Sequence, residues 1–246
     1  AVDNVMLIVS DTLRRDFLGC YMNRWVKTPN IDKFAQMAVV FDRAYVHNFP
    51  TVPARLDIYT GRYTSIYFDW QPLPHNEVVL AEVLSAKDII TFLVGDTYNL
   101  FRDGYYFDRG FMGFEWVRGN GGDRWQTSPK EPPLPADPEK LFEVERYLKK
   151  YLRNASARLG EDDYPCARTM RLAAKWLEAN YREGSFFLHI DTFDPHEPWD
   201  PPRWYVDQYD PGYEGDEVIA PRYAPADFLT PAELGHCRAL YAAEVT

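Results

Sequence analysis

The sequence of 246 residues lacks any run of about 18 or more apolar residues, the length that a membrane-spanning helix needs. It also lacks a block of basic residues: 27 Lys and Arg are scattered along the chain against 37 Asp and Glu, for a net charge of -10. Neither a nucleic acid nor a membrane is therefore an expected partner. The first strand-like segment begins at Asn4, which leaves no room for an uncleaved signal peptide.

Cysteine is scarce. Cys20, Cys166 and Cys237 are odd in number and widely spaced, and they form no CxxC pair and no zinc-finger cluster. They predict ordinary buried thiols rather than a disulfide scaffold. A reducing, cytoplasmic location follows, unless a signal peptide has already been removed.

Apolar residues are plentiful. They make up 46% of the chain, enough to bury a sizeable core in one domain over residues 1–246. Strands buried on both faces are predicted at 4–10, 89–94 and 185–191, with a further strand in the VVFDRAY segment, 39–45. Helices are predicted at 30–38 with Asn30 as cap, 54–60 ended by Gly61, and 78–85, 138–152 and 166–180. Residues 99–138 lack a period and are interpreted as an ordered excursion.

Alternation of strands and helices favours an α/β fold with a largely parallel sheet sandwiched by helices. Each of the three buried strands ends in polar residues: Asp11, the pair Asp96 and Thr97, and the segment 191–196. Because the carboxyl ends of parallel strands line one crevice, these groups are expected to converge on one ligand.

Asp11 and Thr51 are the first candidates for chemistry. Asp11 is a hard oxygen donor directly after a strand, which suits Mg²⁺, Ca²⁺, Mn²⁺ or Zn²⁺, although a turn aspartate has the same pattern. Thr51 offers a hydroxyl that becomes a nucleophile if a metal or base lowers its pKa; taken alone it reads as a turn or helix cap.

Arg55 and His196 are the next candidates. If Pro53 opens the helix, Arg55 lies in its first turn and could bind a phosphate or sulfate beside the helix N-terminus. The alternative is a surface arginine paired with Asp57 or Asp16. His196 lies in a rigid proline-flanked loop that could present its imidazole to a leaving group. For the other four histidines the sequence favours no site: His189 reads as a core residue, and His47, His75 and His236 have no evident partner.

Five segments then show a resemblance in order and spacing to the sulfatase family of the alkaline phosphatase superfamily: VSDTLRRDFLGCY, TPNIDKFA, FDRAY, PTVPARLDIYTGRY and FLHIDTFDPHEPW. The resemblance implies an alkaline-phosphatase-like fold, a divalent metal with Asp11 and Thr51 among its ligands, anion binding by Arg55, and His196 in the substrate loop. It also implies a small anionic ester as substrate.

Three departures from the family's pattern modify these expectations. Where the family has an oxidisable Cys or Ser in CxPxR or SxPxR, this chain has Thr51, which cannot yield formylglycine; other branches of the superfamily attack phosphorus with an unmodified threonine. The GKWHLG-like segment is replaced by VGDTYNLF, in which Thr97 or Tyr98 could contact substrate. The later SDHG-like metal-ligand motif is absent, which suggests a C-terminal truncation, a weakly held metal, and an exposed surface that favours a homo-oligomer.

The sequence therefore predicts a metal-dependent hydrolase that attacks a phosphodiester, phosphonate ester or sulfate ester through Thr51. The alternative is a non-catalytic, sulfatase-like anion-binding domain, since the oxidisable nucleophile and the second pair of metal ligands are missing.

Overall fold

The computed structural model describes residues 4–246, which divide into two compact units. Unit 1 comprises the chain up to Val9, Arg43–Asn120 and Asp162–Phe193, and unit 2 comprises Ser10–Asp42, Gly121–Glu161 and Asp194–Thr246. The expectation of one domain stays a prediction.

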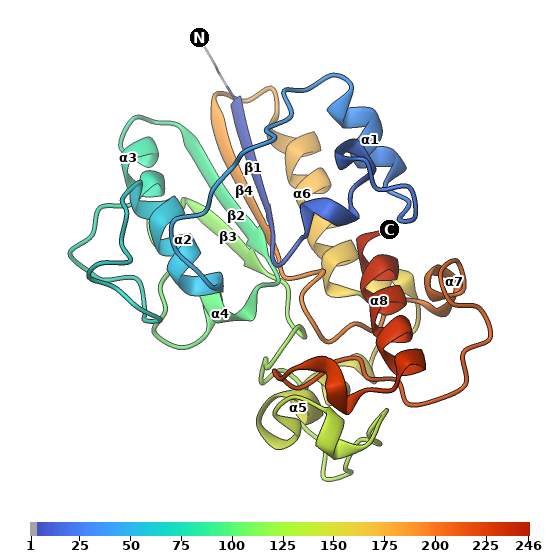
Figure 1. Cartoon of the computed structure of the whole chain (residues 1–246). Helices are drawn as coiled ribbons and strands as arrows, with labels where there is room; N and C mark the ends of the chain where they lie inside the picture. The colour runs from blue at the N-terminus through green and yellow to red at the C-terminus, as the bar shows by residue number, and fades with distance from the viewer. Residues whose placement is uncertain (1–3) are drawn as a thin grey trace. The chain divides into compact units, whose positions relative to one another are not determined.

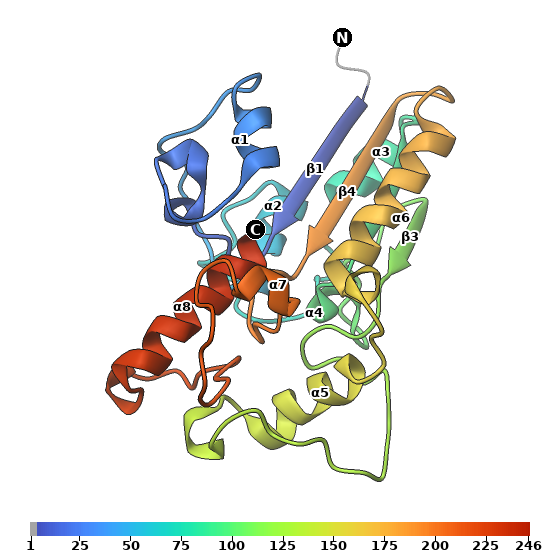
Figure 2. The ribbon, with the colours of Figure 1, turned by 90° about the vertical axis from the view of Figure 1, so that its right-hand side faces the viewer.

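Unit 1 is built on a four-stranded sheet with the order β1-β4-β2-β3. The strands are β1 (Asn4–Ser10), β2 (Ile90–Gly95), β3 (Gly113–Trp116) and β4 (Phe186–Thr192). β2 pairs in parallel with both β3 and β4, and β1 lies beside β4 and points the same way (Figure 2). The predicted α/β fold with a parallel sheet is confirmed.

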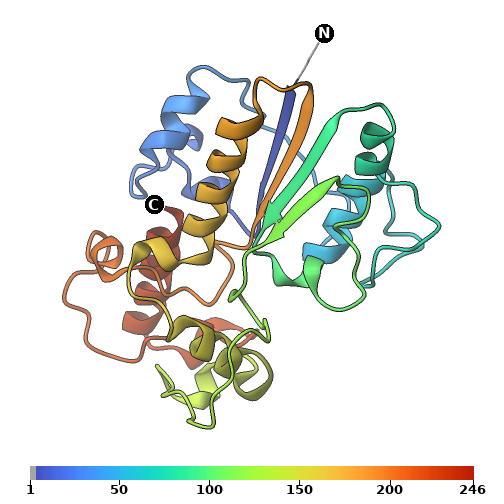
Figure 3. The ribbon, with the colours of Figure 1, turned by 180° about the vertical axis from the view of Figure 1, so that it is seen from behind.

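Helices cover both faces of this sheet. Successive side chains of β4 point to opposite faces, and on each face they pack against a helix. Phe186, Leu188 and Ile190 pack in one cluster with α6 (Pro165–Asn180). On the opposite face, the ring of His189 lies 5.4 Å from that of Tyr59 in α2 (Thr51–Thr60). Figures 1 and 3 show α6 and α2 on opposite sides of the sheet, so β4 is buried along its whole length.

The remaining helices of unit 1 are short. α3 (Leu80–Ser85) precedes β2, and α4 (Tyr98–Phe101) follows it. Both α4 and β3 lie inside 99–138 or at its edge, so the ordered excursion predicted there includes two short regular elements. The sequence pattern of β3 is weak because the strand has only four residues. Its Phe114 and Trp116 stack with Phe101 of α4.

Unit 2 contains four α-helices and most of the short helical turns. The α-helices are α1 (Pro29–Ala35), α5 (Lys149–Ala155), α7 (Arg203–Val206) and α8 (Pro231–Val245). A π-helical segment (Val144–Leu148) leads into α5, and 3-10 turns occur at Arg15–Phe17, Gly19–Tyr21, Pro138–Lys140 and Ala226–Phe228; a further turn, Glu161–Asp163, lies where the two units meet in sequence. No helix of the described residues is long and apolar enough to cross a membrane.

Three local predictions in or near unit 2 were wrong. Helix α1 begins at Pro29 with Thr28 as cap residue, because proline's fixed φ suits the first helical position, so Asn30 is inside the helix. The single helix expected at 138–152 is broken at Glu143, whose φ is 36°, and just before it Phe142 N–H bonds the carbonyl of Ala220.

The third error concerns residues 39–45, which form no strand. The carbonyls of Phe41 and Asp42 accept hydrogen bonds from the side chains of Tyr21 and Arg15 instead of from a neighbouring strand. The apolar side chains that suggested a strand are exposed, including those of Val39 and Phe41.

Candidate functional site

Thr51 is the first residue of α2, a helix of ten residues ended by Gly61 at φ 64° as the sequence predicted. The helix starts three residues earlier than expected, with Pro50 before it, so Pro53 lies within its first turn. Thr51 itself is only 4% exposed. The position places its side chain beside the N–H groups at the helix N-terminus, which attract anions.

The hydroxyl of Thr51 differs from those of the other buried threonines. Each of the others forms a side-chain hydrogen bond: Thr28, Thr64, Thr91, Thr97, Thr169 and Thr192. Within residues 4–246, the Thr51 hydroxyl forms none, and its oxygen is not among the fully enclosed polar atoms. An oxygen that is neither bonded nor sealed off is accessible to a reactant.

Arg55 is buried and bound to Asp191 at the end of β4. Its Nε and Nη2 donate to the two carboxylate oxygens of Asp191, each at 3.0 Å, across 136 residues of sequence. The alternative of a surface arginine paired with Asp57 or Asp16 is therefore wrong. The ion pair ties α2 to the sheet and so fixes the helix that carries Thr51; anion binding by Arg55 stays a prediction.

Asp191 is the centre of the polar cluster in unit 1. Thr97 donates its hydroxyl to the same carboxylate at 2.6 Å, and His189 Nε2 lies 3.5 Å away. Burial by itself would raise the pKa of Asp191, but the charge of Arg55, the nearby imidazole of His189 and the hydrogen bonds from Arg55 outweigh it and lower the pKa below its usual range. The carboxylate therefore stays charged and holds its neighbours in place.

Thr97 and Tyr98, the predicted substrate contacts, lie at the start of α4. Thr97 is fully buried and its hydroxyl is engaged by Asp191, so its structural role is positional. Tyr98 is half-buried, with its ring at 6.0 Å and nearly perpendicular to that of Phe193. Just before them, Gly95 is required by close packing, because a Cβ there would lie 2.6 Å from the carbonyl oxygen of Asp191.

Asp96 organises a second cluster at the same edge of the sheet. Its carboxylate accepts hydrogen bonds from the hydroxyl of Thr169 at 2.7 Å, the backbone N–H of Phe193 at 2.6 Å and the amide of Asn120 at 3.3 Å. These bonds join β2, α6 and the end of β4. The prediction that polar groups at the ends of β2 and β4 converge is thus confirmed within unit 1.

Asp11 and His196 belong to unit 2. Asp11 follows β1 directly, as predicted, and is 6% exposed. His196 is half-buried, with Nδ1 at 2.8 Å from the carbonyl oxygen of Glu197, which also accepts the hydroxyl of Tyr147 at 2.7 Å. The contact places the proton of a neutral imidazole on Nδ1 and the lone pair on Nε2.

The donors present do not make a complete metal site. Among residues 4–246 there is no group of three or more His, Cys, Asp or Glu side chains arranged to hold an ion. Tight binding of Ca²⁺ needs six or more oxygen ligands and Zn²⁺ about four ligands, so Asp11 and Thr51 alone do not fit such an ion. No chemical step below passes through a metal, and their role as ligands stays a prediction.

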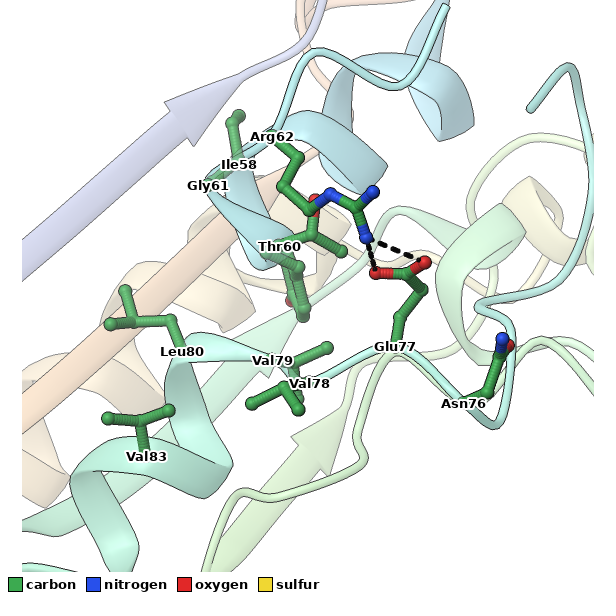
Figure 4. Close-up of a pocket in the computed structure, with 11 residues that line it drawn as sticks. Ile58, Thr60, Gly61, Arg62, Asn76, Glu77, Val78, Val79, Leu80 and Val83 are labelled. Carbon is green, nitrogen blue, oxygen red and sulfur yellow. Dashed lines mark hydrogen bonds and ion pairs between the residues drawn. The ribbon is translucent and has the colours of Figure 1, made fainter. Parts of the chain in front are cut away.

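A pocket of about 400 Å³ lies at the opposite, C-terminal end of α2 (Figure 4). Its walls are mostly apolar, with Val79 and Leu80 among them, and Arg62 Nη1 pairs with Glu77 at 2.7 Å on one side. No predicted site residue lines it. The candidate site is therefore at the Thr51 end of the helix.

Sequence reasoning missed two buried polar centres. Asp191 was recognised as a strand-end residue but not as the partner of Arg55, a pairing that no local pattern reveals. His236, thought to lack a partner, is buried with its ring nitrogens 2.9 Å from Asp210 and 2.8 Å from Glu217. These contacts, too, join residues 19 or more positions apart.

Comparison with known proteins gives consistent matches. A family model described as Sulfatase matches residues 3–233. Iduronate 2-sulfatase of Mus musculus is 26% identical over 222 residues, which cover 84% of this chain and 37% of the relative. The multifunctional alkaline phosphatase superfamily protein PehA of Trinickia caryophylli is 25% identical over 263 residues, covering 89% and 46%. The chain thus spans less than half the length of these relatives.

Solved structures share the fold. The phosphonate monoester hydrolase of Agrobacterium radiobacter superposes with a TM-score of 0.69 at 21% identity, covering 99% of this chain and 56% of that one. That of Silicibacter pomeroyi gives a TM-score of 0.60 at 19% identity, with coverage of 99% and 56%. At such identities the likeness supports the fold.

Proposed function

Because the chain belongs to the sulfatase family, we propose that it is the part of a phosphate- or sulfate-ester hydrolase that carries the nucleophile, Thr51. One observation carries this proposal: Thr51 is the one buried threonine of the described residues whose hydroxyl has no hydrogen bond. Because its oxygen is not enclosed and no hydrogen bond to the protein has to be broken first, a reactant can approach this hydroxyl at the helix N-terminus.

The proposed reaction is an in-line displacement. The Thr51 oxygen forms a bond to phosphorus while the bond from phosphorus to the ester oxygen breaks, and the alcohol leaves with a proton. Water then cleaves the phospho-threonine and restores the hydroxyl. The N–H groups at the start of α2 would stabilise the charge on the equatorial oxygens.

Phosphorus is preferred to sulfur as the reacting atom, because threonine cannot form the aldehyde on which the formylglycine cycle depends. Phosphodiesters and phosphonate esters are therefore the proposed substrate class. The roles predicted for Asp11 and His196 stay predictions.

The test is turnover by the full chain of bis-4-nitrophenyl phosphate, a phenylphosphonate ester and 4-nitrophenyl sulfate, each with Mn²⁺, Zn²⁺ or Ca²⁺. We expect the phosphorus esters to react, and Thr51→Ala to lower kcat by about a thousandfold or more. Thr60→Ala is the matched control: Thr60 ends the same helix, and its hydroxyl bonds the carbonyl of Leu56. Turnover of the sulfate ester alone, or equal losses in both variants, would contradict the proposal.

A second candidate function is non-catalytic anion binding at the same helix terminus. The observation that favours it is the lack of a group of three metal-ligating side chains among the described residues. Phosphate binding by a chain that turns over none of the three esters, weakened by Thr51→Val, would favour this function over hydrolysis.

A further inference from the structure

Unit 2 has a pocket of about 440 Å³ that none of the residues in the proposed reaction lines. Its walls come from the segment after β1, the loop after β4, the 3-10 turn Ala226–Phe228 and α8. The volume is within the range that holds a drug-sized organic molecule.

The floor of the pocket is aromatic and held in place. Tyr241 donates its hydroxyl to the carbonyl of Thr12 at 2.8 Å and accepts the N–H of Arg14 at 2.9 Å. Its ring meets that of Phe17 at 4.7 Å, nearly perpendicular, and that of Trp199 at 5.6 Å. Rings fixed in this way present a rigid apolar surface to a flat ligand.

The charged residues of the lining are all positive: Arg14, Arg222 and Arg238, with no Asp or Glu. This is unusual in a chain with a net charge of -10. Arg14 is paired with Asp16 at 2.7 Å. Among the described residues, no carboxylate pairs with Arg222 or Arg238.

Arg222 contacts an aromatic ring of the pocket. Its Cζ lies 4.5 Å from the centre of the Phe228 ring, a cation–π contact that favours a position of the guanidinium beside this wall of the pocket. The N–H groups around the edge of the guanidinium plane stay available for an anion, since guanidinium binds two oxygens of such a group at once.

We infer that this pocket binds an organic anion with an aromatic ring, the ring on the floor formed by Phe17, Trp199 and Tyr241 and the anionic group at Arg222 and Arg238. Carboxylate, sulfonate and phosphate share the required chemistry: a planar apolar body with a charged end. The inference goes beyond the proposed hydrolysis and does not depend on Thr51.

Calorimetric titration of the full chain tests it with three probes: 2-naphthalenesulfonate, inorganic sulfate and 2-naphthalenemethanol. We expect the aromatic anion to bind at least about tenfold more tightly than either the anion alone or the neutral ring. Added NaCl should weaken binding of 2-naphthalenesulfonate and leave that of the alcohol unchanged. Equal affinity for the alcohol, or no effect of salt, would overturn the inference.

Variants locate the binding. Arg222→Gln and Arg238→Gln should each weaken binding of 2-naphthalenesulfonate about tenfold, because each removes a charge-assisted hydrogen bond. Arg182→Gln is the matched control: its guanidinium lies 4.9 Å from the ring of Tyr181, outside the pocket. Thr51→Ala should bind the probe as the unsubstituted chain does, which separates this inference from the proposed function. Unchanged binding in both pocket variants would refute it.

Discussion

β1 and β4 lie side by side in one sheet and are both largely apolar, yet their surroundings differ. Both are seven-residue runs dominated by apolar side chains, NVMLIVS and FFLHIDT. Every residue of β4 is buried, whereas in β1 Val5 is 47%, Met6 45% and Ile8 53% exposed. The difference follows from position: β4 lies between two strands and two layers of helices, and β1 is an edge strand.

The comparison shows where the sheet can hold charge. Asp191 can stay ionised in the interior because Arg55 and Thr97 reach it from α2 and the start of α4. An edge strand has no such ring of partners. Exposed apolar side chains on an edge instead invite pairing with other polypeptides.

The largest effect is expected from Asp191→Ala. This change leaves the guanidinium of Arg55 buried without its partner, so the free energy of unfolding should fall by about 3–5 kcal/mol. Urea denaturation followed by circular dichroism measures it. A loss below about 1 kcal/mol would mean that the ion pair at the end of β4 contributes little to stability, and so is not an important difference between β4 and β1.

The next largest effect is expected from truncation of apolar side chains, which should lower the free energy of unfolding more in β4 than in β1. Leu188→Ala in β4 creates a cavity against α6 and should cost about 2–5 kcal/mol. The matched change in β1, Ile8→Ala, should cost less than about 1 kcal/mol, since half of the side chain is already in water. Equal losses in urea denaturation would contradict the difference in burial.

The contribution of Asp191 to the free energy of unfolding should decrease in acid. Its pKa is lowered by folding, so the stabilisation from its charge is present above the unfolded value of about 4 and is lost as pH falls through the folded value. The stability gap between the unsubstituted chain and Asp191→Asn should therefore be constant from about pH 8 to pH 5 and narrow in stronger acid. Denaturation at several pH values tests this; a gap that widens in acid would be evidence against the ion pair.

The smallest effect on stability is expected at the edge strand, where association is the readout. Ile8→Lys should change the free energy of unfolding by no more than about 0.5 kcal/mol and reduce any self-association of the chain. Sedimentation velocity at several concentrations measures it. Val83→Lys is the control, because Val83 is an apolar residue with a similar exposure, 43%, but belongs to the helix α3 and not to a strand. The same reduction in both variants would show that the edge of β1 is not responsible.

Much of the local structure followed from sequence. The strands β1, β2 and β4 and the helix α6 were predicted to within a residue or so, because continuous apolar runs and helical periodicity are local signals. The helix ended by Gly61 was predicted as well, although it begins at Thr51, which the sequence placed in the preceding loop. The strand predicted at 39–45 was wrong because an apolar run indicates only a preference for a sheet. A strand forms only where a neighbouring strand is available for pairing.

The sequence by itself therefore determined the α/β class, the strand ends that bear Asp96 and Asp191, and the helix that Gly61 ends. Only the tertiary structure decided that Arg55 pairs with Asp191, that Thr51 alone among the buried threonines of residues 4–246 has an unengaged hydroxyl, and that β1 is exposed while β4 is not. The physical reason is the distance in sequence over which each kind of interaction acts. Propensity and periodicity act over a few residues, whereas strand order and the partner of a buried charge depend on segments more than a hundred residues apart.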